Sequence, residues 1–232
     1  LFPYTTLFRS GYQWSYTKKF NSPKIKADEQ VRLFFGGIDC LAEIWLNGKH
    51  IGSANNMFIE HAFDVTDRLV ESGENTLQVI IRSAVIEAQN YMLGTFSVGN
   101  FAATESTYIR KAPHSYGWDI MPRLVSAGLW RDVELQVVNE TNIVNTQWMT
   151  SSINIANNSA QVFADIQLAI PFDKLDKTNA QITLKRNGKT VHDEKILITS
   201  HAFRHIMHLE NVDFWWPRGY GDPAVYDAEV KL

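Results

Sequence analysis

Apolar and polar positions alternate along most of the chain from residue 11 onward, in short stretches separated by polar turns. Tyr12, Trp14 and Tyr16 occupy every second position, and residues 31–35 and 75–82 are further apolar-rich stretches. Because successive side chains of a strand point to opposite faces, a period of two places one face of each stretch inward. The pattern therefore predicts β-strands with one buried face.

Two dipeptides predict tight hairpins. Asn47-Gly48 lies between the strand-like residues 41–46 and 49–51, and Asn187-Gly188 lies between residues 180–186 and 189–198. Both positions of an Asn-Gly pair tolerate the positive φ that two-residue hairpin turns require. Residues 67–70 are expected to form one short helical turn.

A polar break at residues 139–141 separates two series of predicted strands. Residues 129–138 close the first series, and residues 143–149 open a second one that suits an antiparallel sandwich of about 100 residues. We therefore expect an all-β protein of two antiparallel β-sandwich domains, residues 11–138 and 139–232. Residues 83–126 carry no long periodic pattern, which is typical of a functional segment.

Composition narrows the function classes. The formal net charge of −3 gives no general attraction to nucleic acid, and no run of about 18 apolar residues predicts a membrane span. Cys40 is the single cysteine, so an internal disulfide is impossible, and we expect it to be a small buried residue rather than a nucleophile.

The first ten residues, LFPYTTLFRS, lack the charged start and small-residue cleavage site of a secretion signal. Their wording resembles a translated sequencing adapter, so we treat residues 1–10 as a non-native segment. The native start is then missing as well, and the compartment stays unspecified.

One turn-rich segment, residues 108–131, concentrates chemistry that suits a sugar. It places Trp118 beside Asp119, with Arg110, His114 and Arg123 nearby. Aromatic faces cover the apolar C–H patches of sugars, and charged forks take pairs of hydroxyls. Spacing alone also fits an Asp119 that caps a turn beside a buried Trp118.

Several phrases resemble the β-mannosidase branch of glycoside hydrolase family 2. Residues 117–123 read Gly-Trp-Asp-Ile-Met-Pro-Arg where the family has Gly-Trp-Asp-Trp-Gly-Pro-Arg. The other matching phrases are Ala-Glu-Ile-Trp-Leu-Asn-Gly at 42–48, Gly-Leu-Trp-Arg at 128–131 and Trp-Trp-Pro-Arg-Gly-Tyr-Gly at 215–221. The resemblance covers residues 11–232 and implies a jelly-roll, galactose-binding-like domain followed by an immunoglobulin-like one, with a catalytic barrel beyond this chain.

The resemblance also implies site residues. The segment around Asp119 would reach into the sugar pocket, which makes substrate-binding candidates of Asp119, Trp118, Arg123, Arg110 and His114. The phrase at 215–221 would lie against the missing barrel, with Trp215, Trp216, Arg218 and Tyr220 as interface residues. We expect those aromatic residues to be buried rather than exposed. Trp14, Trp45 and Trp130 are expected to be core residues.

Three further expectations concern side chains near these motifs. Lys111 is expected to be a solvated surface charge, and Glu105 to have no second carboxyl group beside it that could complete a catalytic pair. No cofactor or metal is expected, because the closest histidine spacing, His201, His205 and His208, follows a strand on which Phe203 and Ile206 alternate with them.

The chain offers no convincing pair of catalytic carboxylates, so the resemblance places both on the absent barrel and predicts that this chain alone is inactive. The full-length enzyme would remove terminal, non-reducing β-D-mannose from oligosaccharides with retention. Its partners would be a β-mannoside oligosaccharide or glycan and that barrel, and the family is compatible with a periplasmic, secreted or lysosomal setting. Two alternatives stay open: a free-standing carbohydrate-binding module, and a family 2 enzyme acting on glucosamine, galactose or glucuronic acid.

Overall fold

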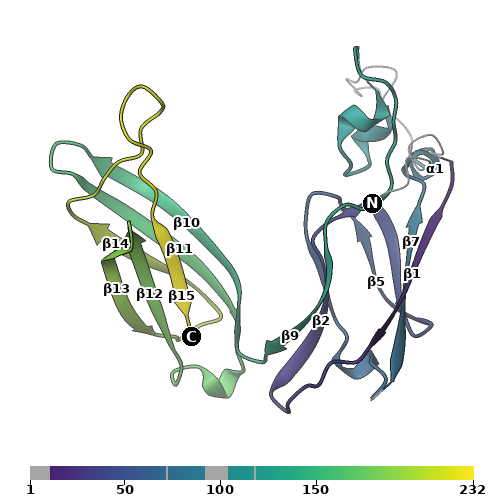
Figure 1. The fold of residues 1–232 in the computed structure, drawn as a ribbon, viewed down its shortest axis with the longest axis horizontal. Coiled ribbons are helices and arrows are strands. Elements are labelled where there is room, and N and C mark those ends of the chain that lie inside the picture. Colours follow the sequence, from purple (N-terminus) through teal and green to yellow (C-terminus); the bar gives the residue numbers. More distant parts are fainter. Residues whose placement is uncertain (1–10, 72, 92–103, 118) are drawn as a thin grey trace. The chain divides into compact units, whose positions relative to one another are not determined.

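The structure of the chain is a computed structural model that describes residues 11–71, 73–91, 104–117 and 119–232. Antiparallel strands dominate it, which confirms the all-β prediction (Figure 1). The chain forms two compact units, Leu1–Val138 and Asn139–Leu232. No helix in the described part of the chain is both long and apolar enough to cross a membrane.

The first unit is a sandwich of two main sheets. One sheet has the strand order β1-β7-β4-β5, and the other has the order β6-β2-β9. A small two-stranded sheet, β3-β8, joins the chain near residue 38 to the chain near residue 129. The bounds of these strands are β1 Trp14–Asn21, β2 Glu29–Phe35, β3 Ile38–Asp39, β4 Leu41–Leu46, β5 Lys49–Asn55, β6 His61–Asp64, β7 Glu74–Arg82, β8 Gly128–Leu129 and β9 Val133–Asn139.

The core of the first unit follows the predicted alternation. Alternate residues of β2 and β4 are buried and pack with those of β7 in one cluster. Its fully buried members include Val31, Phe35, Ile44 and Ile81. Burial of such branched side chains between two sheets is the main favourable contribution to folding.

The Asn47-Gly48 hairpin is confirmed between β4 and β5, with φ angles of 52° and 76°. The Asn47 side chain adds tertiary bonds, since its amide donates to Arg68 O at 3.0 Å and its oxygen accepts from Thr76 N at 2.9 Å. The expected helical turn is present as η2, Thr66–Arg68.

Some details of the first unit differ from expectation. Tyr12 precedes β1 and is exposed, because the strand begins only at Trp14. The strand predicted over residues 129–138 is interrupted between β8 and β9, and Val137 is exposed. Trp130 is also exposed and lies under the Arg131 guanidinium, whose central carbon is 4.3 Å from its ring, so the core prediction for Trp130 is wrong.

Trp14 and Trp45 are partly buried. Trp14 packs against the main core. Trp45 lies on the face of β4 opposite the buried one and contacts the His50 ring edge-on, with centroids 5.0 Å apart. Trp45 therefore lies outside the core that its alternating pattern predicts.

The second unit pairs a sheet of order β10-β11-β14 with a sheet of order β13-β12-β15. The bounds are β10 Asn142–Asn154, β11 Ser159–Ala169, β12 Asn179–Arg186, β13 Lys189–Leu197, β14 Ala202–Leu209 and β15 Asp227–Lys231, with the short helix η5 at Phe172–Lys174. The Asn187-Gly188 hairpin is confirmed between β12 and β13, with φ angles of 50° and 75°. Ile166, Ile182 and Met207 are among the buried residues that these strands contribute to one core.

Candidate functional site

Residues 83–127 connect β7 to β8 and contain the candidate sugar-binding residues. The described part of this segment contains three short helices: α1 at Ala84–Ala88, η3 at Thr104–Thr107 and η4 at Pro113–Tyr116. The Ser83 hydroxyl accepts the Ile86 N–H at 3.1 Å and so caps α1. Figure 1 shows the teal η3–η4 region at the same end of the first unit as α1, and η3 contacts α1.

A buried ion pair anchors this segment. The Lys111 ammonium lies 2.6 Å and 2.5 Å from the two carboxylate oxygens of Asp39 in β3. Ser126 completes the group, because its hydroxyl donates to Asp39 at 2.6 Å and accepts from Lys111 at 2.9 Å. Lys111 is 1% exposed, so its prediction as a solvated surface charge is wrong. Its charge is tolerated in the interior because a carboxylate and a hydroxyl surround it.

A second group orders the chain around Tyr116, which is fully buried. The Arg123 guanidinium lies over the Tyr116 ring at 5.6 Å and donates to the Tyr116 carbonyl at 3.2 Å. It also donates to Glu105 Oε1 at 2.6 Å. Through this ion pair with Glu105, Arg123 ties η3 to the end of η4. Burial, followed by the nearby Cys40, Glu105 and Asp39, raises the pKa of the Tyr116 phenol above its ordinary value.

The tip of the segment follows directly at Gly117, whose φ of 96° and ψ of 153° belong to a region that glycine almost alone adopts. Asp119, Ile120 and Met121 are exposed, and Ile120 is 85% exposed. Trp118 lies outside the described residues, so its role in binding substrate stays a prediction. The described side chains of this tip, residues 119–121, are therefore open to solvent.

The Asp119 carboxylate makes no hydrogen bond and no ion pair with any residue that the structure describes. It therefore caps no turn there, and none of Arg110, His114 and Arg123 holds it. His114 and Arg110 are exposed. Arg110 forms an isolated β-bridge with Asn56, the residue that follows β5. Arg110, His114, Asp119 and Arg123 thus share one segment, and Asp119 makes no hydrogen bond or ion pair with the other three.

The phrase at residues 215–221 forms a separate exposed group in the second unit. Trp215 is 59% and Tyr220 is 80% exposed, and Trp216 and Arg218 are exposed as well. None of these four residues belongs to the core of the second unit. Trp215 and Trp216 line a hollow of about 440 Å³, and Trp148 of β10 lines it as well. Their burial against a catalytic barrel stays a prediction.

Metal-binding potential lies elsewhere in the second unit. Among the described residues, the side chains of His192, Glu194 and His205 form the single group of three metal-type ligands close enough to share an ion. His201 instead bonds the Ile170 carbonyl at 2.9 Å, and His208 is exposed. His205 lies beside His192 and Glu194. The signal that sequence reasoning missed was the alternate spacing of His192 and Glu194 on one strand.

The strand reading at residues 201–208 needs one correction. β14 is a strand as expected, but Phe203, His205 and Met207 share its inner face, whereas Ile206 is 51% exposed on the outer one.

Cys40 is buried as expected, and burial, followed by the Asp39 charge, raises the pKa of its thiol to about 12.

Comparison with known proteins decides the family. A family model described as "Glycosyl hydrolase 2 galactose-binding domain-like" matches residues 6–131, which is more than half of the chain. The chain belongs to glycoside hydrolase family 2. The match includes the candidate segment, its two anchoring groups and the Asp119 tip.

Relatives that match nearly the whole chain carry the name β-mannosidase. Beta-mannosidase B of Aspergillus terreus is 31% identical over 224 residues, which cover 94% of this chain and 26% of that protein. Beta-mannosidase B of Aspergillus oryzae is 30% identical over 225 residues, with the same two coverages. The chain therefore spans about a quarter of the length of these curated relatives.

Solved structures agree with the fold. The β-D-mannosidase of Dictyoglomus thermophilum superposes with a TM-score of 0.79 at 28% identity, covering 97% of this chain and 28% of that one. A β-glucuronidase of Bifidobacterium dentium superposes with a TM-score of 0.68 at 20% identity, covering 96% of this chain and 37% of that one. The second likeness supports the two-sandwich fold alone.

Proposed function

We propose that this chain is the N-terminal, non-catalytic part of a retaining exo-β-mannosidase, and that its Asp119 tip forms part of the substrate pocket. The observation that carries the proposal is an exposed carboxylate held on an anchored segment. Asp119 follows the buried Tyr116 and Gly117 closely and is left without a partner among the described residues. The names of the relatives with 28–31% identity support mannose as the sugar.

The anchoring groups give the tip a definite position. Lys111 and Ser126 both bind Asp39, so the two ends of residues 111–126 are held at one place on β3. Arg123 fixes the chain on the far side of the tip to Glu105 and to the Tyr116 carbonyl. A side chain on such a support binds a sugar with little loss of conformational freedom, because the segment is ordered before the sugar arrives.

In the proposed enzyme, the Asp119 carboxylate accepts hydrogen bonds from two hydroxyls of the terminal mannose. Charged hydrogen bonds of this kind are stronger than neutral ones, particularly where a ring shields them from water. Binding energy gained away from the reacting bond helps to hold the sugar ring in a geometry close to the transition state. The acid/base and the nucleophile reside on another part of the full-length protein.

Two glutamates of the first unit, Glu43 and Glu105, already have structural partners. Glu105 binds Arg123, and Glu43 lies 2.8 Å from His50 and 3.8 Å from Arg82. Retaining glycosidases need two carboxyl groups about 5–5.5 Å apart across the scissile bond. The partners of Glu43 and Glu105 support the proposal that catalysis belongs to residues beyond this chain.

The test replaces Asp119 in a full-length version encoded by the parent gene. Asp119→Ala is expected to lower kcat/KM for p-nitrophenyl β-D-mannoside about 10- to 100-fold, the range that corresponds to loss of one or two charged hydrogen bonds. The melting temperature should stay unchanged, because the exposed side chain makes no hydrogen bond or ion pair with a described residue. Asp28→Ala, another exposed carboxylate of the first unit, is the matched control.

Unchanged kinetics for Asp119→Ala would remove Asp119 from the pocket. Substrate identity is checked on the same full-length protein with the β-glucuronide, β-galactoside and β-glucosaminide. Faster turnover of any of these would replace the mannoside assignment and leave the family unaltered.

The exposed Trp215 and Tyr220 favour a second candidate, a carbohydrate-binding module that acts without a barrel. Exposed aromatic rings stack on sugar faces. Titrating the 232-residue chain with manno-oligosaccharides separates the two functions. Micromolar binding that Trp215→Ala abolishes would favour the module, whereas no binding favours a pocket completed by the barrel.

A further inference from the structure

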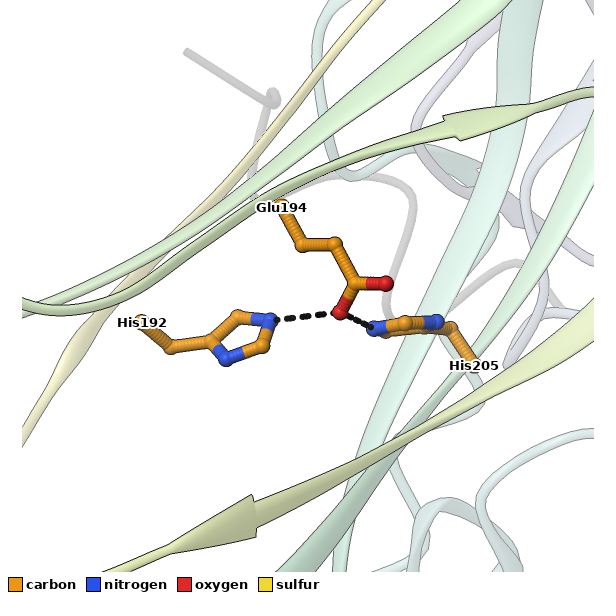
Figure 2. A group of neighbouring side chains, drawn as sticks. All are labelled: His192, Glu194 and His205. Carbon is orange, nitrogen blue, oxygen red and sulfur yellow. Dashed lines mark ion pairs between the residues drawn. The ribbon is translucent and has the colours of Figure 1, made fainter.

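The group formed by His192, Glu194 and His205 lies at the edge where the two sheets of the second unit meet. His192 and Glu194 are two positions apart on β13, so their side chains leave the strand on the same face. His205 comes from β14, which belongs to the other sheet and contacts β13. Figure 2 shows both imidazole rings directed at the Glu194 carboxylate, one from each side.

The distances in this group are those between ligands of one metal ion. Glu194 Oε2 lies 3.2 Å from His205 Nε2 and 3.6 Å from His192 Nε2. In a tetrahedral site with bonds of about 2.0–2.2 Å, neighbouring ligand atoms are about 3.4 Å apart. All three ligand atoms also lie within 4.8 Å of one another, so a single ion can reach them with small side-chain adjustments.

The Nε2 atoms of His192 and His205 make no hydrogen bond with any described residue. Both Nε2 atoms are buried, and neither makes a hydrogen bond, although each is near the carboxylate. A buried polar atom without a partner costs free energy, so such pairs of atoms usually have a role. A neutral imidazole offers the lone pair that a metal requires.

The ligand types select the class of ion. Two imidazoles and one carboxylate suit Zn²⁺ and neighbouring first-row divalent ions, whereas Mg²⁺ and Ca²⁺ prefer sets made wholly of oxygen. The Glu194 side chain is half exposed, which leaves one side of the group open to water or to an external ligand.

We propose that His192 Nε2, His205 Nε2 and Glu194 Oε2 bind one Zn²⁺-class ion that cross-links β13 to β14 and so joins the two sheets of the second unit. The bound ion stabilises the folded unit, because the unfolded chain does not hold the three ligands together. This proposal is independent of the proposed glycosidase function, since it concerns the second unit alone.

The test titrates Zn²⁺ into the purified, tag-free chain by isothermal titration calorimetry at neutral pH. One equivalent is expected to bind, and Mg²⁺ is expected not to. Glu194→Gln should weaken Zn²⁺ binding at least tenfold, since even loss of a residue that only supports a ligand costs about 10- to 100-fold. His192→Ala should do the same.

Two matched controls keep the result specific. His208→Ala changes an exposed histidine on the same strand as His205, and His50→Ala changes a histidine that lies 2.8 Å from Glu43 in the first unit. Both controls should bind Zn²⁺ like the parent chain. Zn²⁺ should also raise the melting temperature of the parent chain and of both controls, with no rise for Glu194→Gln.

Binding of Co²⁺ tests the parent chain itself, so this readout does not depend on whether any variant folds. The parent chain should show the visible absorption of Co²⁺ in a four- or five-coordinate site with nitrogen ligands, and Zn²⁺ should displace it. Absence of stoichiometric binding to the parent chain would overturn the proposal. Binding that Glu194→Gln leaves intact, or that His50→Ala or His208→Ala abolishes, would overturn it equally.

Discussion

Lys111 and Asp39 are 72 positions apart in sequence, yet the ammonium of one lies 2.6 Å and 2.5 Å from the carboxylate oxygens of the other in the interior of the first unit. Asp39 belongs to β3, and its strand partner in β8 is Gly128, two residues after Ser126. The ion pair therefore closes the base of the segment that carries Asp119, at the point where that segment rejoins the sandwich. The position of the candidate site depends on this buried contact.

Breaking this pair from one side should be costly. We expect Lys111→Met to destabilise the chain by about 3–5 kcal/mol, because it leaves the Asp39 charge buried with only the Ser126 hydroxyl as a partner. Urea denaturation followed by circular dichroism measures the loss. The double variant Asp39→Leu/Lys111→Met should recover most of it, because no buried charge is left unpaired. A double variant as unstable as the single one would show that packing, and not the charge, decides the stability here.

The backbone at Gly117 gives a second prediction. Gly117→Ala should destabilise the chain by about 1–3 kcal/mol, because its φ of 96° and ψ of 153° lie in a region closed to other residues. The added Cβ would also approach Arg123 Cβ to 3.3 Å. Gly188→Ala is the control, since Gly188 has a positive φ of 75° and open space around it. Thermal denaturation should show a clearly larger loss for Gly117→Ala; equal losses would mean that the turn before the Asp119 tip carries no special constraint.

Cys40 predicts a pH dependence of stability. Burial raises the pKa of its thiol from an ordinary 9.0 to about 12, so the unfolded chain loses this proton at lower pH than the folded chain. The resulting stability is fully present below pH 9 and is lost as the pH rises toward 12. Between pH 9 and 11, the unfolding free energy of the parent chain should therefore fall more steeply than that of Cys40→Ala. Parallel curves would contradict a buried thiol, as would rapid labelling of the native chain by a thiol reagent.

Features that depend on a few neighbouring residues were predictable from the sequence. The Asn47-Gly48 and Asn187-Gly188 hairpins were predicted correctly, because the backbone preferences of two residues decide them. The strands of both units were found for a similar reason, since alternation of apolar side chains is a local pattern. The family wording at residues 117–123 identified the candidate segment in the same way.

Exposure was predicted less well wherever a side chain meets a distant partner. Lys111 reads as a surface charge because the sequence around it is polar, and its burial requires Asp39 from another strand. Trp130 reads as a core residue because it is aromatic and follows a predicted strand pattern, yet the surrounding fold leaves it exposed. Glu105 acquires a partner only because η3 and the chain after η4 meet at Arg123.

The sequence by itself thus determined the fold class, the two strand series, the hairpins and the segment that carries Asp119, because these follow from periodicity and short motifs. Only the tertiary structure decided which charges are buried, and which histidines of β13 and β14 meet at Glu194. The physical reason is that a side chain's burial and partners depend on how strands pack across a sandwich. That packing joins residues far apart in the chain, and no local pattern records it.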